Sequence, residues 1–229
     1  MNPAFTFRRN IMIKLCIFDL DGTLINSIED LADAGNFALS EMGYPTHDVD
    51  AYKYFVGNGI PKLIERMTPE NKRTPEILST VHKIFSERYK VHCLDKTKPY
   101  DGVIELIEFC RENNIKTAVL SNKADNFAKF IVDTVFPENT FDFVMGQRED
   151  IPKKPAPDGV FKILDLFSVK KEEALLMGDS DVDIITAINS EIHSIGAVWG
   201  FRGEEELKGA GAERIAFSPM EVIEILKNL

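Results

Sequence analysis

Two aspartates lie one residue apart where a buried strand is expected to end. Asp19 and Asp21 follow the apolar run IKLCIF at 13–18, and Gly22 and Thr23 come directly after them. Asp and Gly are common turn residues, so a turn at the end of a strand explains this stretch on its own. A second interpretation is catalytic, with one carboxylate attacking an electrophile and the other transferring protons. The rest of the sequence must decide between them.

Reactive side chains also occur where other strands are expected to end. They are Ser121 and Asn122 at the end of KTAVLS (116–121), Lys154 in the loop QREDIPKKPAPD after FDFVMG (141–146), and Asp179 and Asp183 in GDSDVD after EALLMG (173–178). Crowded carboxylates repel one another and need a cation or a shared proton. A set of oxygen ligands without a suitably placed His or Cys favours Mg²⁺. A hydroxyl and a lysine beside it suit a phosphoryl group.

Simpler interpretations exist for several of these residues. Ser121 precedes a helical pattern and fits a helix N-cap. Asp181 and Asp183 fit the first turn of a helix, where acidic side chains interact favourably with the helix dipole. Lys154 is a stronger functional candidate than Lys153, because the residue before a proline is kept out of helical geometry.

The elements that must position these residues alternate between strand and helix. The expected strands are 13–18, 116–121, 141–146, 173–178, 193–198 and 214–217, and amphipathic helical patterns lie between most of them. Such alternation predicts an α/β fold with a mostly parallel, Rossmann-like sheet. Parallel sheets bind ligands beyond the carboxyl ends of their strands, where the candidate residues fall.

One region contains helical patterns and no convincing strand. It predicts a helical domain at 26–93, inserted into a core made of 12–25 and 94–229, with 1–11 as an N-terminal extension. The stretch VGNG interrupts the inserted helices. Gly57, Asn58 and Gly59 fit either a turn between two helices or a loop that contacts the substrate.

Composition limits the function. The 229 residues include 27 basic and 37 acidic side chains, for a formal charge of −10. This balance argues against nucleic-acid binding, which requires clustered Lys and Arg. No apolar stretch is long enough to span a bilayer, and the first eleven residues lack the long apolar stretch of a secretory signal. The three cysteines form no CxxC pair, so we expect a reducing cytoplasm and buried thiols.

Four short motifs together resemble the haloacid dehalogenase superfamily of phosphohydrolases, particularly its phosphoglycolate-phosphatase-like members. The four motifs are DLDGT (19–23), LSN (120–122), KKPAPD (153–158) and GDSDVD (178–183). Two further stretches, PYDG (99–102) and VWGFR (198–202), also resemble that subgroup. Their order, strand context and spacing agree with the family. The resemblance extends from about residue 13 to the C-terminus and implies a core with an inserted helical cap.

The resemblance implies roles for individual residues. Asp19 would attack phosphorus and become an aspartyl-phosphate, while Asp21 would protonate the leaving alkoxide and then activate water. Mg²⁺ would be held by the Asp19 carboxylate, the Asp21 backbone carbonyl and Asp179, with Asp183 supporting it directly or through water. Ser121 and Lys154 would orient and neutralise the phosphoryl oxygens. The following residues are expected to line the substrate: Gly22, Thr23, Asn122, Gly57, Asn58 and Gly59.

The expected function is a Mg²⁺-dependent phosphatase for a small phosphorylated metabolite such as 2-phosphoglycolate. A dehalogenase or a phosphonate hydrolase would lack the acid at Asp21. A sugar phosphomutase and a pyrophosphatase remain alternatives within the same fold, because both can use the same chemistry. A receiver-type phospho-accepting domain is the alternative from another class. The oligomeric state, monomer or homodimer, is left open.

Overall fold

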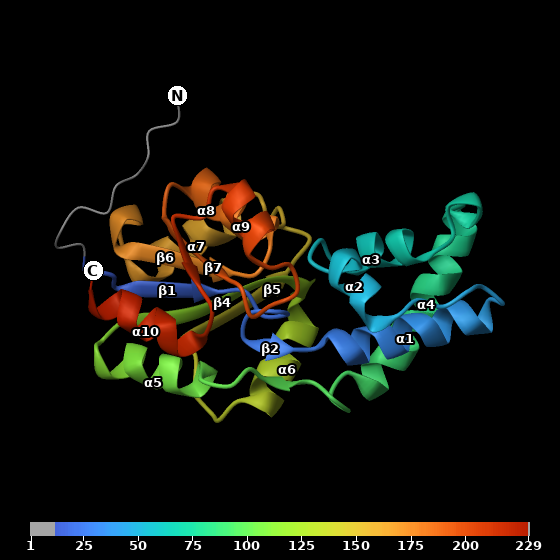
Figure 1. Cartoon of the computed structure of the whole chain (residues 1–229), viewed down its shortest axis with the longest axis horizontal. Coiled ribbons are helices and arrows are strands. Elements are labelled where there is room, and N and C mark those ends of the chain that lie inside the picture. Colours follow the sequence, from blue (N-terminus) through green and yellow to red (C-terminus); the bar gives the residue numbers. More distant parts are fainter. Residues whose placement is uncertain (1–11, 229) are drawn as a thin grey trace. The chain divides into compact units, whose positions relative to one another are not determined.

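The computed structural model describes residues 12–228, so the extension expected at 1–11 lies outside the described residues. The described chain forms two compact units. One consists of 12–24 together with 99–228, and the other is the continuous segment 25–98 (Figure 1).

The unit formed by 12–24 and 99–228 is built on a parallel sheet of six strands in the order β5-β4-β1-β6-β7-β8. The strands are β1 (Leu15–Phe18), β4 (Lys116–Ala124), β5 (Phe143–Gln147), β6 (Ala174–Gly178), β7 (His193–Ala197) and β8 (Arg214–Ala216). All six lie where the sequence predicts strands, and the predicted α/β fold is confirmed. The clearest difference is β4, which continues three residues beyond the predicted end at Ser121.

The strand order places the carboxyl end of β1 between two neighbours. Phe18 pairs with Val119 of β4 on one side and with Met177 of β6 on the other. The chain therefore passes from β1 to one half of the sheet, and later returns to build the other half from β6 outward. Such a point of reversal leaves a crevice beyond the strand ends, which is the usual ligand site of open α/β sheets.

Helices cover both faces of the sheet. They are α5 (Val103–Glu112), α6 (Asp125–Val135), α7 (Asp158–Phe167), α8 (Asp181–Ser190), α9 (Glu204–Ala210) and α10 (Pro219–Lys227). Figure 1 shows α5 and α10 on one face and α7, α8 and α9 on the other. Because both faces are covered, β1 and β6 are buried along their whole length, which explains why they read as continuous apolar runs instead of alternating patterns.

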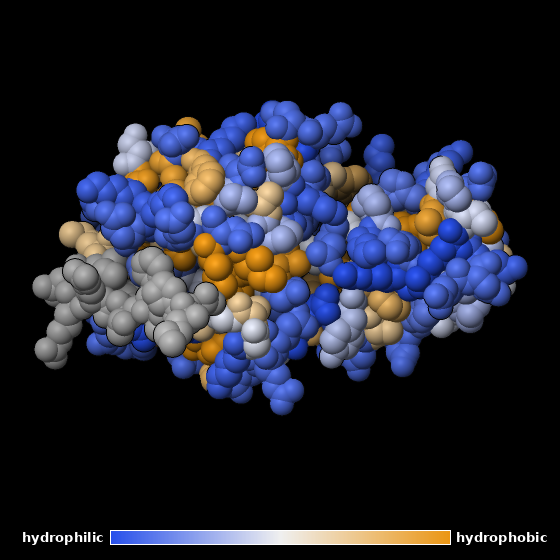
Figure 2. All heavy atoms as spheres, turned by 90° about the horizontal axis from the view of Figure 1, so that it is seen from above, coloured by the Kyte–Doolittle hydropathy of each residue, from blue (hydrophilic) through white to orange (hydrophobic). Residues whose placement is uncertain are grey.

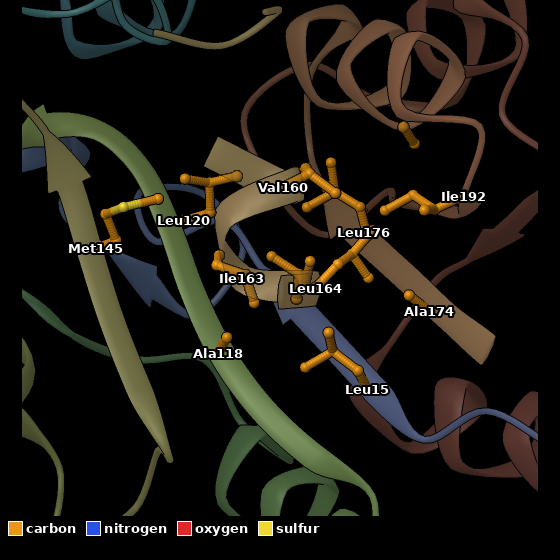
Figure 3. Close-up of a cluster of buried hydrophobic side chains, with 12 residues drawn as sticks. Leu15, Ala118, Leu120, Met145, Val160, Ile163, Leu164, Ala174, Leu176 and Ile192 are labelled. Carbon is orange, nitrogen blue, oxygen red and sulfur yellow. The ribbon is translucent and has the colours of Figure 1, made fainter. Parts of the chain in front are cut away.

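Helix α7 contributes the centre of one core layer. Its Val160, Ile163 and Leu164 side chains lie over Leu15 of β1 and Leu176 of β6 (Figure 3). Leu164 is 6% exposed, whereas Leu166 on the same helix is 56% exposed. The helix thus presents one apolar face to the sheet, and its N-terminus follows directly on the loop that carries Lys154.

The unit 25–98 is helical. It contains α1 (Ile28–Glu41), α2 (Val49–Phe55), α3 (Ile60–Met67), a short 3₁₀ helix (Glu70–Lys72) and α4 (Pro75–His92), and the short strands β2 (Ile25–Asn26) and β3 (Lys98–Pro99) pair with each other at its two ends. Gly35 of α1 leaves room for Tyr52, since a Cβ there would lie 2.4 Å from the tyrosine Oη. Buried Asp30 accepts hydrogen bonds from the backbones of Lys96 and Thr97 and so fixes the returning chain.

The face of the molecule shown in Figure 2 is mostly polar. Figure 2 shows hydrophilic side chains over most of the face in view, with smaller apolar groups between them. Among the described residues, no helix has the length and apolar character needed to cross a membrane.

The two leucines of α7 provide a matched test of the core. We expect Leu164→Ala to lower the free energy of unfolding by about 2–5 kcal/mol, because it leaves a cavity between helix and sheet. Leu166→Ala makes the same chemical change on the exposed face and should alter it by less than about 0.5 kcal/mol. Urea denaturation followed by circular dichroism measures both, and equal losses would contradict the packing described.

Candidate active site

The ammonium group of Lys154 lies at the centre of the residues gathered beyond β1. Its Nζ is 2.7 Å from Oδ1 of Asp19 and 2.6 Å from Oδ1 of Asp183. Burial alone lowers the pKa of Lys154, but the charges of Asp183 and Asp19 outweigh it, so the pKa is raised and the lysine stays charged. Asn122 supports this arrangement by donating its amide N–H to the Lys154 carbonyl at 3.0 Å.

Asp183 serves two purposes at the start of α8. Its Oδ2 accepts hydrogen bonds from the backbone N–H and the hydroxyl of Ser180, at 3.2 and 2.7 Å, which completes a capping box. Its Oδ1 accepts from Lys154. Gly178 makes this close packing feasible, because a Cβ there would lie 2.1 Å from Cγ of Asp183. The predicted position of Asp183 in the first turn of a helix is confirmed, and the same side chain also contacts Lys154.

Asp179 is held between two glycines. Its Oδ2 accepts the backbone N–H of Phe201 at 2.7 Å. A Cβ on Gly22 would lie 2.3 Å from Oδ2 of Asp179, and a Cβ on Gly200 would lie 2.2 Å from its Cβ. Gly22 also has φ of +89°, a left-handed conformation that favours glycine. The loop around Gly200 thus fixes the orientation of a carboxylate far away in sequence.

Three buried carboxylates form an acidic cluster. Asp19, Asp179 and Asp183 each offer an oxygen, and these oxygens lie within 4.8 Å of one another. Burial raises the pKa of Asp19 to about 7; Lys154 opposes the shift, and Asp183 and Asp21 add to it. Burial, followed by the charges of Asp183 and Asp19, also raises the pKa of Asp179.

The donor set of the acidic cluster fits a hard divalent cation. All three donors are carboxylate oxygens, which Mg²⁺ prefers. Burial is the main cause of the raised pKa values of Asp19 and Asp179, and the neighbouring carboxylates add to it, so a cation in this cluster would stabilise the charged forms. The Asp21 carboxylate is not part of this group. Metal binding by these four residues remains a prediction.

Asp21 has a lysine partner that the sequence analysis did not single out. Lys123 places its Nζ 3.1 Å from Oδ1 and 3.0 Å from Oδ2 of Asp21. Ser121 lies two residues earlier and accepts the backbone N–H of Lys123 on its Oγ at 3.2 Å. Because β4 continues to Ala124 and α6 begins only at Asp125, Ser121 is not a helix cap.

The other predicted substrate residues fall into two groups. Thr23 is fully buried, and its backbone carbonyl accepts a hydrogen bond from Nε1 of Trp199 at 3.0 Å, so it anchors the turn after Asp21. Gly57, Asn58 and Gly59 lie in the loop between α2 and α3 of the unit 25–98, with φ of +108° at Gly57 and +83° at Gly59. A role in substrate binding remains a prediction for each of them.

Sequence comparison identifies the family. The family model for haloacid dehalogenase-like hydrolases matches residues 16–197, which include all four motifs. The chain belongs to the haloacid dehalogenase-like hydrolase family. It is similar to the phosphoglycolate phosphatases of Aquifex aeolicus, at 31% identity over 82% of this chain and 86% of the relative, and of Vibrio parahaemolyticus, at 30% identity over 93% and 96%.

Solved structures of haloacid dehalogenase-like hydrolases and their relatives share the fold. A protein from Lactobacillus delbrueckii subsp. bulgaricus matches with a TM-score of 0.88 and 30% identity, covering 94% of this chain and 98% of that one. A predicted phosphatase from Clostridium acetobutylicum matches with a TM-score of 0.83 and 25% identity, over 95% and 100%. The predictions of family, fold and hydrolase class are therefore confirmed.

The raised pKa of Asp19 has a consequence for stability. Its value of about 7 in the folded protein lies above the roughly 3.9 of an unfolded chain. The folded state therefore retains this proton longer, and the associated stability is present below about pH 4 and lost as pH rises through about 7. Asp19→Asn stays neutral at every pH. In EDTA, we expect its unfolding temperature to exceed that of the wild type by a margin that grows between pH 5 and pH 8.

Circular dichroism melts across that range provide the measurement. Asp181→Asn is the matched control, since it removes one negative charge from the same region but outside the acidic cluster. A difference between Asp19→Asn and wild type that stays constant from pH 5 to pH 8 would contradict the raised pKa.

Proposed function

We propose that this protein is a Mg²⁺-dependent phosphatase that hydrolyses a small phosphomonoester, such as 2-phosphoglycolate, through an aspartyl-phosphate on Asp19. The observation that carries the proposal is the contact of the Lys154 ammonium with Asp19, 2.7 Å from Oδ1, at the carboxyl end of β1. The relatives named phosphoglycolate phosphatase support the reaction class, a phosphoric monoester hydrolase, and suggest the substrate.

The first half of the reaction forms the phosphoenzyme. A carboxylate oxygen of Asp19 attacks phosphorus while the bond between phosphorus and the leaving alkoxide breaks. Asp21 gives a proton to the alkoxide, which departs as an alcohol. In this proposal the Lys154 ammonium and the Ser121 hydroxyl bind phosphoryl oxygens, because such transfers depend on positioning and charge neutralisation.

The second half regenerates the enzyme. Asp21, now a carboxylate, accepts a proton from the water that attacks phosphorus, and inorganic phosphate leaves as Asp19 is restored. The residues that would hold Mg²⁺ are Asp19, Asp179, Asp183 and the Asp21 backbone carbonyl. When bound, the ion supplies positive charge beside the phosphoryl group and the acidic cluster.

The helical unit 25–98 is proposed to be the cap that recognises the leaving group and excludes water. Gly57, Asn58 and Gly59 are its candidate substrate residues. The expectations of a cytoplasmic location and of a monomer or homodimer stay predictions. Family membership disfavours the receiver-type alternative, while a sugar phosphomutase and a pyrophosphatase are distinguished by experiment.

A phosphate-release screen tests the proposal. It compares 2-phosphoglycolate, sugar monophosphates and pyrophosphate, each with and without Mg²⁺. We expect Mg²⁺-dependent release from a small monoester, and a loss of at least about a thousandfold in Asp19→Asn, because the attacking oxygen is replaced by an amide. Asp181→Asn should stay within about twofold of wild type, since it belongs to the first turn of α8 and not to the acidic cluster.

Other outcomes would redirect the assignment. Isomerisation of a sugar phosphate without net phosphate release would indicate a mutase, and preferential cleavage of pyrophosphate would indicate a pyrophosphatase. Undiminished release by Asp19→Asn would exclude the proposed nucleophile.

Metal binding has a separate readout. Mg²⁺ should raise the unfolding temperature of the wild type, because a ligand that binds only the folded state stabilises that state. At a Mg²⁺ concentration of one hundred times its Kd, the free energy of unfolding should rise by about 2.7 kcal/mol. Asp179→Asn replaces one of the three clustered carboxylates by a neutral amide, which is a weaker ligand for a divalent cation, and should show a much smaller rise, whereas Asp181→Asn should respond like wild type. Equal rises in wild type and Asp179→Asn would contradict the proposed metal site.

A further inference from the structure

A second buried lysine lies beside the proposed acid and base. The Lys123 side chain is 4% exposed and that of Asp21 is 11% exposed. The Nζ of Lys123 is almost equidistant from the two Asp21 oxygens, at 3.1 and 3.0 Å. Lysine is rarely buried without a charged partner, because removing an ammonium from water is costly. A contact with both oxygens also restrains the position of the carboxylate.

The end of β4 holds Lys123 in place. The register between β4 and β5 shifts between Leu120 and Ala124, and such irregularities re-aim the side chains next to active sites. Ser121 fixes the backbone N–H of Lys123. On the neighbouring strand, Gly146 allows a close approach, because a Cβ there would lie 2.5 Å from the Lys123 carbonyl oxygen. The lysine thus belongs to the end of a strand and not to a loop.

The two buried lysines hold different carboxylates. Lys154 contacts Asp19 and Asp183, which belong to the acidic cluster, and Lys123 contacts Asp21, which does not. This separation matters because the proposed reaction needs Asp19 against phosphorus and Asp21 against the leaving oxygen or the attacking water. A proton is transferred efficiently only when donor and acceptor lie within about 3 Å in a suitable orientation.

We propose that Lys123 is a positioning residue that acts through Asp21: it holds the carboxylate where protons are delivered to the leaving group and taken from water. This inference rests on the proposed function, because it assigns a task within that reaction. It differs from two alternatives. Lys123 as a purely structural ion pair would affect stability only, and Lys123 as a substrate ligand would affect KM.

The leaving group separates these cases. p-Nitrophenolate departs without protonation, whereas the alkoxide of 2-phosphoglycolate needs a proton as it leaves. We expect Lys123→Met to lower kcat/KM about a hundredfold for 2-phosphoglycolate, the size typical of losing acid–base assistance, and less than about fivefold for p-nitrophenyl phosphate. KM for 2-phosphoglycolate should change less than about threefold, since the lysine does not bind the substrate.

Two further variants protect the test against misfolding. Lys123→Arg keeps the charge but moves the hydrogen-bond donors. It should therefore lower kcat/KM for 2-phosphoglycolate by about three- to tenfold, and again affect p-nitrophenyl phosphate less. In the Asp21→Asn background, Lys123→Met should cause no further loss, because both changes remove one function. Lys129→Met is the matched control. It removes a lysine from a surface ion pair with Asp125, at 2.7 Å, and should leave both substrates unaffected.

The results decide the inference directly. The inference is supported if Lys123→Met lowers kcat/KM selectively for 2-phosphoglycolate and causes no further loss in the Asp21→Asn background. Equal losses of kcat/KM on both substrates, a rise in KM with kcat unchanged, or full activity of Lys123→Met would overturn it while the phosphatase assignment stands. The comparison uses kcat/KM because this ratio reports the steps up to the phosphoenzyme and not the later attack by water, which both substrates share. A wild type that releases no phosphate from either substrate overturns the proposed function and this inference together.

Discussion

The bridge from Lys154 to Asp19 and Asp183 is the interaction on which the rest of the site depends. It joins a loop after β5, the end of β1 and the first turn of α8, three segments distant in sequence. Without a cation between them, two buried carboxylates at this distance would repel strongly. The ammonium therefore permits the chain to gather acidic groups in its interior.

The sheet makes that bridge feasible. Parallel strands in register bring their carboxyl ends to one edge of the sheet. The residues that follow Phe18, Val119 and Met177 therefore lie close together because their strands are paired. Glycines then permit approaches that any side chain would block. The backbone architecture thus fixes the distances, and a few side chains supply the charge.

Much of the fold and site follows from the sequence because both depend on local patterns. Continuous apolar runs identify buried strands, and the polar residues directly after them, such as Asp19 and Asp179, identify the rim. Lys154 lies farther from its strand, and the proline that follows it is the local signal that distinguishes it from Lys153. Lys123 was passed over because nothing local indicates that β4 continues past Ser121 with an irregular register. The Phe201 contact was equally invisible, since every residue except proline carries a backbone N–H.

The setting of Asp179 limits how this protein can diverge. Asp179 accepts its hydrogen bond from the main chain of Phe201, so a substitution of the side chain at 201 keeps the donor unless the new residue is proline. Gly22 and Gly200 lie against the carboxylate from two sides, so neither can acquire even a methyl group. Over evolutionary time, substitutions at position 201 should therefore be tolerated more easily than substitutions of Gly22 or Gly200.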